Sequence, residues 1–385
     1  MKIAFITHAI GIGGGSLSSS MTIQYLLEKE FLKPENCIIL HEERPEPTNE
    51  KNDVYFKLRS SIKFFQVRLP FSLAYKGSNS QNNAAFYEFY RFVLMMIKSI
   101  NFLLFYNKIL NEEEVTVVHL NSLVLWPLLP VLPGSMKKII HIREVPNDSV
   151  EARIAIFIIR RYATKIISID PISDIPFSDS GKSVVILNPI SMTTSRALRS
   201  RKNELKREWG ISPGSFVVSI FGRIGEQKGF GFFLELVDSC RTIKNLIFII
   251  IGKPSGKFGE DCIQKLTRYS HVKYFGEHQD TSPFFAITDV VIRCEDYLPL
   301  GRTVWEAIYA GSIALVPYNK TDDLSVIQEY LGNYVYPYRA LDRDSCRETL
   351  KKIIEEYPGT VIDTGFPVSD NLSKSAEHFL KEITP

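Results

Sequence analysis

The chain of 385 residues is long enough for two domains of ordinary size, each with a core of its own. Hydrophobic residues make up 45% of the chain and charged residues 23%, which excludes a disordered protein. The net charge of +3 at pH 7 argues neither for nor against nucleic acid, and because no nucleic-acid-binding module is recognisable, we expect no such partner.

The first half of the chain predicts an α/β domain. Residues 2–7 form an apolar strand that opens into a glycine loop, and a helix starting at the serines of 16–20 follows. Further strands are predicted at residues 116–120, 138–142, 165–169 and 184–187. Because these runs are continuously apolar and not alternating, they indicate a parallel sheet that is covered on both faces.

One segment of the first half, residues 55–110, is basic and aromatic. It contains a single acidic residue, Glu88, against eight Lys or Arg at positions 57, 59, 63, 68, 76, 91, 98 and 108. An amphipathic helix over residues 86–110 would suit an anionic membrane surface, and a helix packed on its own sheet is the equal alternative. Polar residues and prolines interrupt the apolar stretches 92–110 and 117–132, so we expect neither to cross a bilayer.

The second half repeats the opening of the first. A strand at residues 216–221 leads into a glycine turn and a helix, and more strands are predicted at 246–251, 272–275, 290–293 and 313–316. Two doubly wound domains are therefore expected. We place them at residues 1–190 and 191–365, with the polar stretch 191–206 as their connection and a separate C-terminal helix in residues 366–385.

The glycine turn that starts the second domain carries two cations. Arg223 and Lys228 flank it, between Gly222 and the helix that follows. Backbone N–H groups at a helix start, a guanidinium fork and an ammonium group together suit a pyrophosphate. The alternative is a solvated turn, but the position between a strand and a helix favours a binding loop.

A second motif lies after the strand at 290–293. Gly301 permits close backbone approach, and Arg302 and Thr303 start a helix whose free N–H groups can hold phosphate. Glu306 lies one turn further along, where its carboxylate can accept hydrogen bonds from both hydroxyls of a ribose. Its apolar neighbours predict a largely buried helix, in which an unpaired carboxylate is costly.

These motifs resemble glycosyltransferase family 4, over nearly the whole chain. The resemblance implies a GT-B fold, in which an acceptor-binding and a nucleotide-sugar-binding Rossmann-like domain face each other across a cleft. It assigns the donor diphosphate to the Arg223 and Lys228 turn and the ribose to Glu306, and it implies that the C-terminal helix in residues 366–385 crosses back to the first domain. It also implies that Gly14 and Gly15 face the diphosphate and that His141 contacts the donor sugar, although a histidine at a strand end is more often structural.

The resemblance and the neighbouring polar residues suggest further contacts with the donor sugar or the acceptor. His119 and Asn121 end the strand beside that of His141, and Arg143 follows it. The family has a glutamate eight residues before the position that Glu306 matches, whereas this chain has Leu298 there. Glu295 or Asp296 can replace that glutamate, but we slightly favour reading both as loop charges.

The function that follows is a retaining, metal-independent transferase. It would move sugar from a UDP- or GDP-sugar to a glycan or lipid-linked acceptor in cell-surface polysaccharide biosynthesis, with no cofactor. The Asp-x-Asp sequence at 342–344 lies near the C-terminus and more plausibly caps a helix than binds a metal ion. Five scattered cysteines without a CxxC pair and a first strand unlike a signal peptide predict a cytoplasmic protein, with peripheral binding at the inner membrane face.

Two other classes of function stay open. Leu298 makes a weak or inactive nucleotide-sugar-binding protein credible. A dinucleotide-dependent oxidoreductase is less favoured, because the third glycine of its loop would be Ser16 and only Glu42 or Glu43 represents its ribose-binding acid.

Overall fold

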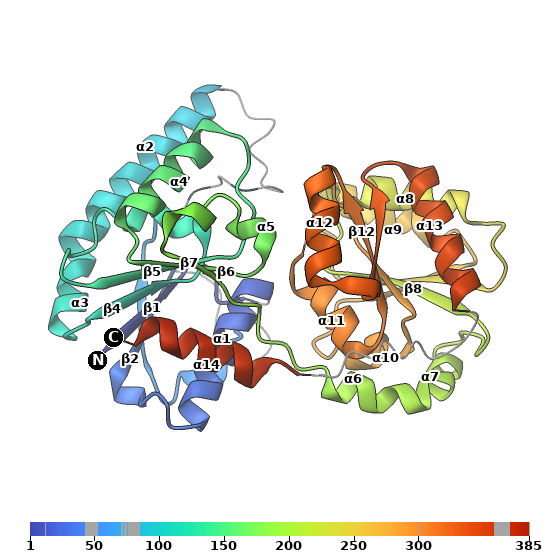
Figure 1. The fold of residues 1–385 in the computed structure, drawn as a ribbon, viewed down its shortest axis with the longest axis horizontal. Coiled ribbons are helices and arrows are strands. Elements are labelled where there is room, and N and C mark those ends of the chain that lie inside the picture. The colour runs from blue at the N-terminus through green and yellow to red at the C-terminus, as the bar shows by residue number, and fades with distance from the viewer. Residues whose placement is uncertain are drawn as a thin grey trace. The chain divides into compact units, whose positions relative to one another are not determined.

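A computed structural model describes residues 1–11, 13–42, 53–70, 72, 75, 85–298, 300–357 and 370–384. The chain divides into two compact units (Figure 1). Unit 1 contains residues 1–189 together with 372–385, and unit 2 contains residues 190–371. The polypeptide therefore leaves unit 1 once, builds unit 2, and returns to unit 1 at its C-terminal end.

Unit 1 is built on a seven-stranded parallel sheet with the order β3-β2-β1-β4-β5-β6-β7. The strand order reverses between β1 and β4, and such a switch point opens a crevice at the carboxyl ends of the strands. The strands are β1 (Ile3–Thr7), β2 (Cys37–Glu42), β3 (Lys63–Val67), β4 (Val117–Leu120), β5 (Lys137–Ile142), β6 (Lys165–Ser168) and β7 (Ser183–Val185).

Alternating strand residues point to two separate cores, one on each face of this sheet. Ile6 packs into the first core with α2 (Ala85–Asn101), the π-helical turn η4 (Phe102–Tyr106), α3 (Asn107–Glu112), η5 (Leu123–Leu128) and α4 (Val150–Tyr162). Phe5 packs into the second with α1 (Gly14–Glu28) and α14 (Leu372–Ile383). The predicted helix at 86–110 is the run α2-η4-α3. Short helical elements complete the unit: η1 (Pro34–Asn36), η2 (Phe56–Leu58), α5 (Pro171–Asp174) and η6 (Ser178–Ser180).

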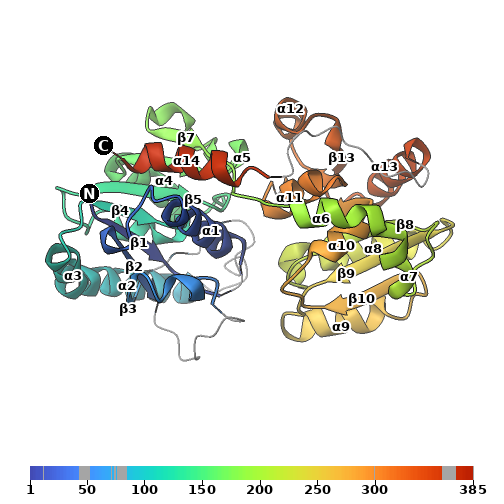
Figure 2. The ribbon, with the colours of Figure 1, turned by 90° about the horizontal axis from the view of Figure 1, so that it is seen from below.

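The C-terminal helix α14 belongs to unit 1. Phe379 stacks on Phe5 of β1 with ring centroids 6.5 Å apart. Glu382 forms an ion pair of 2.8 Å with Lys165 at the start of β6. These contacts tie the end of the chain to the first sheet, on the face that α1 also covers (Figure 2).

Unit 2 is built on a six-stranded parallel sheet with the order β10-β9-β8-β11-β12-β13. Its switch point lies between β8 and β11. The strands are β8 (Phe216–Phe221), β9 (Leu246–Ile251), β10 (Val272–Gly276), β11 (Val290–Ile292), β12 (Ile313–Tyr318) and β13 (Val335–Arg339). The two parallel sheets with their helices form the α/β architecture that the sequence predicts.

The helices of unit 2 alternate with its strands. They are α6 (Thr193–Leu198), η7 (Arg199–Arg201), α7 (Lys202–Glu208), η8 (Glu226–Lys228), α8 (Phe230–Ser239), α9 (Gly256–Leu266), α10 (Ser282–Ile287), α11 (Arg302–Ala310), α12 (Thr321–Tyr330), η9 (Gly332–Tyr334) and α13 (Arg343–Glu356). The stretch 191–206, predicted to be a connection, is helical and part of the unit. Its buried Arg199 donates hydrogen bonds to the carbonyls of Phe285 and Thr288.

Candidate functional site

The turn after β8 lies at the switch point of the second sheet and approaches the end of β11. Gly222 and Gly229 have φ of +117° and +70°, a region that favours glycine. A Cβ on Gly229 would lie 1.7 Å from the carbonyl oxygen of Cys294. Glycine is thus required at 229, because it lets the turn pack directly on the segment that follows β11.

This close approach joins Lys228 to a buried ion-pair cluster. Lys228 Nζ lies 3.2 Å from Glu295 Oε1, and Arg293 Nε donates to Glu295 Oε2 at 3.1 Å. The side chain of Glu295 is 1% exposed and that of Lys228 is 42% exposed. Burial by itself would raise the pKa of Glu295, but the charges of Arg293 and Lys228 outweigh it and lower this pKa to about 2.

The other predicted cation of the turn, Arg223, is exposed. Its side chain has no hydrogen-bond or ion-pair partner among the residues that the structure describes. The turn therefore carries one cation, Lys228, that is paired with a buried carboxylate, and one, Arg223, that is free to bind a ligand. Guanidinium and ammonium groups beside a glycine turn form an arrangement that binds phosphate oxygens.

The start of α11 provides the second part of the candidate site. Gly301 is its N-cap and makes no side-chain capping bond, and Arg302 and Thr303 form its first turn. Glu306 forms an ion pair of 2.9 Å with Arg302, and its side chain is 18% exposed. One ion pair leaves a carboxylate able to accept further hydrogen bonds, as ribose recognition would require. Val304 and Trp305 are buried, as expected for a largely buried helix.

The three residues around the missing family glutamate have different environments. Leu298 is 2% exposed, so an apolar side chain fills the place where the resemblance expects a carboxylate. Asp296 is exposed, as a loop charge would be. For Glu295 the loop-charge interpretation is wrong, because its carboxylate is buried and bound to Arg293 and Lys228.

In unit 1 the predicted residues meet at the carboxyl ends of β4 and β5. Arg143 donates to Asn121 Oδ1 at 2.7 Å and to Asn188 Oδ1 at 2.8 Å. Asn121 in turn donates to the carbonyl of Gly15 at 3.5 Å, and a Cβ on Gly15 would lie 2.9 Å from Cδ of Arg143. Gly13 caps α1 without a side-chain bond, and Gly14 is its first residue. The glycine loop and the two strand ends thus form one polar cluster.

The two histidines of this cluster are buried and adjacent. His119 Nε2 lies 3.3 Å from His141 Nδ1, and Arg143 Nη2 lies 3.4 Å from the same atom. Burial, followed by the charge of Arg143, lowers the pKa of His119 to about 3. The same two causes, with His119 added, lower the pKa of His141 well below 6.5. Both rings are therefore neutral at pH 7.

The hydrogen bonds assign a proton to Nε2 of His141. Arg143 can only donate, so Nδ1 of His141 accepts, and the proton of a neutral ring is then on Nε2. This Nε2 is buried and has no hydrogen-bond partner among the described residues. A buried donor without a partner is costly, and a ligand oxygen would satisfy it.

Sequence reasoning missed two members of these clusters. Asn188 directly follows the last predicted strand of the first half and was not among the candidate residues, yet it accepts a hydrogen bond from Arg143. Arg293 was counted only as the last residue of a strand, yet its buried side chain neutralises Glu295. A charged residue ending an otherwise apolar strand was the available signal, because a buried charge needs a partner.

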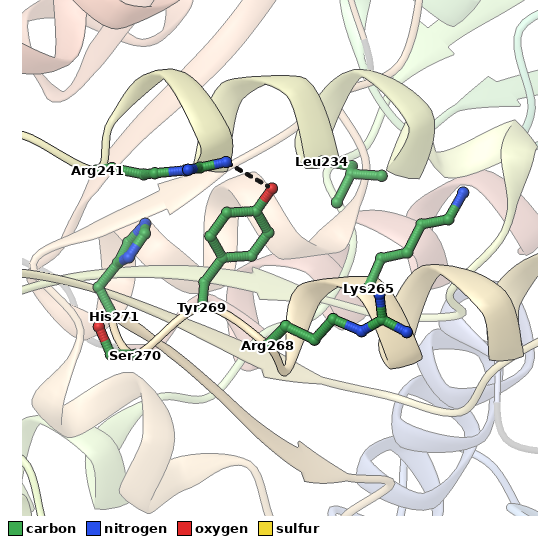
Figure 3. A pocket seen from close by; sticks show the side chains of 7 residues that line it. All are labelled: Leu234, Arg241, Lys265, Arg268, Tyr269, Ser270 and His271. Carbon is green, nitrogen blue, oxygen red and sulfur yellow. Dashed lines mark hydrogen bonds between the residues drawn. The ribbon is translucent and has the colours of Figure 1, made fainter.

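A separate basic hollow lies at the opposite end of the second sheet. It has a volume of about 540 Å³ and is lined by Arg241, Lys265, Arg268 and His271 among others (Figure 3). Arg241 donates to the hydroxyl of Tyr269 at 3.5 Å and also pairs with Asp238. These residues follow α8 or precede β10, so they lie away from the glycine turn, and the hollow contains none of the predicted site residues.

Two observations bear on the other chemistries considered. Among the described residues no group of three or more His, Cys, Asp or Glu side chains is arranged to hold a metal ion. Glu42, at the end of β2, accepts a hydrogen bond of 2.6 Å from the backbone N–H of Leu69 and lies 3.6 Å from Lys98. Of the two candidate ribose-binding acids of an oxidoreductase, Glu42 is thus already engaged within unit 1, and Glu43 lies outside the described residues.

Comparison with known proteins points to one class of enzyme. Residues 201–358 match the family model described as glycosyl transferases group 1. No curated protein matches the chain. Similar solved structures include HepE from Anabaena in complex with UDP and glucose, at 15% identity and a TM-score of 0.68, covering 100% of this chain and 95% of that one.

Two other similar structures are of lipopolysaccharide glycosyltransferases. The outer core galactosyltransferase WaaB has 16% identity and a TM-score of 0.63, over 99% of this chain and 98% of that one. WaaG, a glycosyltransferase involved in lipopolysaccharide biosynthesis, has 14% identity and a TM-score of 0.61, over 98% and 95%. At these identities the likeness shows the fold. The chain thus has the GT-B fold, and its residues 201–358 carry a glycosyl transferases group 1 domain.

Proposed function

We propose that the protein is a glycosyltransferase that moves a sugar from a UDP- or GDP-sugar to a glycan or lipid-linked saccharide acceptor. The proposal rests on the Arg223 and Lys228 turn together with the start of α11, which we call the cradle. The turn follows β8 and α11 follows β11, the two strands at the switch point of unit 2. Backbone N–H groups and two cations suit the diphosphate, and Glu306 suits the ribose. The cradle lies inside the segment matched by the family model.

The donor is proposed to be a nucleotide sugar because of this chemistry and because HepE was solved with UDP and glucose. The nucleotide sugar is a substrate, and we propose that no cofactor or metal ion is required. Arg223 and Lys228 supply positive charge next to the diphosphate, which is the task that a divalent ion performs in other transferases. Retention of the anomeric configuration is part of the same proposal and rests on the family resemblance.

The cluster in unit 1 is proposed to contact the donor sugar and the acceptor. The neutral His141 ring offers Nε2–H to a sugar oxygen, while Arg143 and Asn121 hold the ring and the Gly15 loop in place. A neutral hydrogen-bond donor can bind a hydroxyl oxygen without adding a charge that would need a counterion. WaaB and WaaG are described as glycosyltransferases of lipopolysaccharide, and the likeness to them supports a role in cell-surface polysaccharide biosynthesis.

A cytoplasmic location is also proposed. All five cysteines are buried and none is paired in a disulfide. Free thiols persist in a reducing compartment, where nucleotide sugars would have to be present for the proposed reaction.

One observation favours a second candidate function. The buried Leu298 replaces a carboxylate that would bind hydroxyls of the transferred sugar. A protein that binds the nucleotide part but transfers the sugar poorly would be the result. This candidate predicts donor binding without release of sugar, whereas the transferase predicts both.

The experiment is a screen of nucleotide sugars by thermal stabilisation, followed by measurement of sugar release and transfer. A ligand at a hundred times its Kd adds about 2.7 kcal/mol to stability, which is readily detected. Arg223→Ala and Lys228→Ala should each weaken binding of the selected donor by roughly 1.5 to 3 kcal/mol, because each removes a charged hydrogen bond. Lys265→Ala removes an exposed cation elsewhere in unit 2 and serves as the control.

Each outcome decides between the candidates. Unchanged donor affinity in both Arg223→Ala and Lys228→Ala would overturn the proposed cradle. Binding without turnover on any acceptor would favour the binding protein. For an active enzyme, an inverted product by NMR would contradict retention, and activity lost in EDTA and restored by magnesium would contradict metal independence.

A further inference from the structure

Unit 1 exposes an unusual number of large apolar side chains on the helices over one face of its sheet. The run α2-η4 and helix α4 both contact η5, and their inner residues join the same core, so their outer sides point away from the sheet (Figure 1). We call these outer sides the outer apolar surface. Its exposed members are Ile97, Ile100, Leu103, Leu104 and Phe105 on α2-η4, and Val150, Ile154 and Phe157 on α4.

The degree of exposure is high for residues of this kind. Leu104 is 64% exposed, Phe105 65% and Phe157 66%. Single exposed apolar residues are common, but a gathering of them on two helices that both pack on η5 marks a surface that is covered by something else. None of these residues belongs to the site proposed for the transferase reaction.

The charges on this surface point to what covers it. Arg153 and Arg161 lie four residues before and after Phe157, so all three share one side of α4. Both arginines are exposed, and Arg153 has no side-chain partner in the described part of the chain. Arg161 lies only over the ring of its neighbour Tyr162, at 5.7 Å.

The cations of the predicted basic segment contribute less than its sequence indicates. Lys63 is paired with Glu113 at 2.8 Å, and Lys98 lies 3.6 Å from Glu42 and donates to the carbonyl of Leu69. Lys76 lies outside the described residues. Lys108 is 77% exposed, with Glu112 at 3.5 Å. The side chain of Arg91, on α2, lies outside the described part of the structure. Among the described side chains, the cations without an acidic partner that we can place beside the outer apolar surface are therefore those of α4, a helix that was not part of the prediction.

The α2-η4-α3 run is suited to lie on a membrane and not to cross it. Residues Val93–Glu112 are long and apolar enough to span a bilayer by length and composition. However, Met95, Phe102 and Leu110 are buried in the core of unit 1, and Asn107 donates to the carbonyl of Val131 at 2.8 Å. A crossing helix would have to abandon these contacts, whereas an interfacial helix keeps them and exposes only its outer side.

We propose that the outer apolar surface docks unit 1 on an anionic lipid bilayer. Phe157, Phe105 and Leu104 enter the boundary between head groups and acyl chains, and Arg153 and Arg161 contact the anionic head groups. Apolar side chains flanked by unpaired arginines match such a surface in both polarity and charge. This proposal concerns a lipid partner and does not depend on whether the protein transfers sugar.

The test is flotation of the full chain with vesicles of phosphatidylcholine alone and of phosphatidylcholine mixed with phosphatidylglycerol. Binding should require the anionic lipid and fall as salt is raised, because salt screens the head-group attraction. Arg153→Glu with Arg161→Glu should lower the partition coefficient by about thirtyfold or more, since each cation near such a surface contributes about fivefold. Phe105→Ser with Phe157→Ser should lower binding at least as much.

The matched controls lie on the other face of the same sheet. Phe31 is 48% exposed and Lys57 is exposed, and both adjoin residues of the second core, Leu32 and Leu58. Phe31→Ser with Lys57→Glu changes one aromatic and one cation there, and should leave binding unchanged. Thermal unfolding of every variant checks that it folds, and all substituted side chains are exposed, so unfolding temperatures should stay close to the wild type.

Three results would overturn the proposal. The first is no flotation with anionic vesicles at low salt. The second is an equal loss of binding in the controls and in the outer-surface variants. The third is a wild-type protein that is a dimer and does not bind vesicles, together with a Phe157→Ser variant that is a monomer. That result would make this surface an interface between copies of the chain.

Discussion

The buried cluster below the glycine turn allows a quantitative prediction for Glu295→Gln. The difference between an ordinary glutamate pKa of 4.5 and a pKa of about 2 corresponds to roughly 3 kcal/mol at neutral pH. Loss of the charge also leaves the buried Arg293 without its carboxylate, and breaking a buried pair costs about 3 to 5 kcal/mol. We therefore expect Glu295→Gln to lower the free energy of unfolding of unit 2 by about 3 kcal/mol at pH 7.

The sign of the pH dependence follows from the lowered pKa. The stabilisation by Glu295 is fully present above the unfolded pKa near 4.5 and is lost as the pH falls toward 2. By pH 3.5 the wild type should have lost roughly 1 kcal/mol of this contribution, and Glu295→Gln should have lost none of it. The difference between the two proteins should thus shrink by that amount between pH 7 and pH 3.5.

The tryptophans permit this measurement in the full chain. Trp126 is in unit 1, and Trp209 and Trp305 are in unit 2, so in a Trp126→Phe background the fluorescence reports unit 2 alone. Urea unfolding would then give the free energies, with Asp296→Asn as the control because its side chain is exposed. A change below about 0.5 kcal/mol in Glu295→Gln at pH 7, the range of ordinary surface substitutions, would refute the argument.

Two further predictions concern one residue of each unit, Leu298 in unit 2 and His119 in unit 1. Because Leu298 cannot accept hydrogen bonds from sugar hydroxyls, the wild type should prefer a deoxy or acetamido sugar to a plain hexose. Leu298→Glu should shift the ratio of kcat/KM for the two donors toward the hexose by about 1 to 3 kcal/mol. An unchanged preference between two such donors would contradict this. His119, with a pKa of about 3, stays neutral in the fold while the unfolded chain takes up a proton below pH 6.5, so the wild type should lose about 1.4 kcal/mol per pH unit more than His119→Phe between pH 6 and 4. Trp126 fluorescence follows unit 1, and parallel stability profiles would show the assignment of the neutral ring wrong.

The fold class was predictable because local signals agree along the chain. Short, continuously apolar runs rich in β-branched residues, such as residues 246–251, indicate strands buried on both faces, and glycine turns after them mark the crevice end of the sheet. The fold comparisons confirm the two-sheet α/β architecture. The start of α1 was placed slightly too late, at the serines, because Gly13 caps the helix without a side-chain bond that a capping rule would recognise.

The sequence located the loops of the candidate site but not the pairing between them. Lys228 and Glu295 are far apart in the chain and meet only because β8 and β11 are neighbours in the sheet. A pattern read along the chain cannot supply that neighbour relation. Likewise α4 is apolar on almost every side, so its sequence does not distinguish the exposed Phe157 from the buried Ile159.

The ion pairs within the cradle affect how a donor would have to bind. Lys228 is paired with Glu295 and Arg302 with Glu306, so three predicted phosphate or ribose contacts, Lys228, Arg302 and Glu306, already have protein partners. A diphosphate cannot draw Lys228 away without leaving some charge of Glu295 uncompensated, but Arg293 remains bound to that carboxylate from the buried side. Arg293 therefore allows the ammonium group to be shared between Glu295 and a ligand. By the same reasoning, an Arg293→Met variant should bind a diphosphate more weakly even though Arg293 itself is buried and has no access to it.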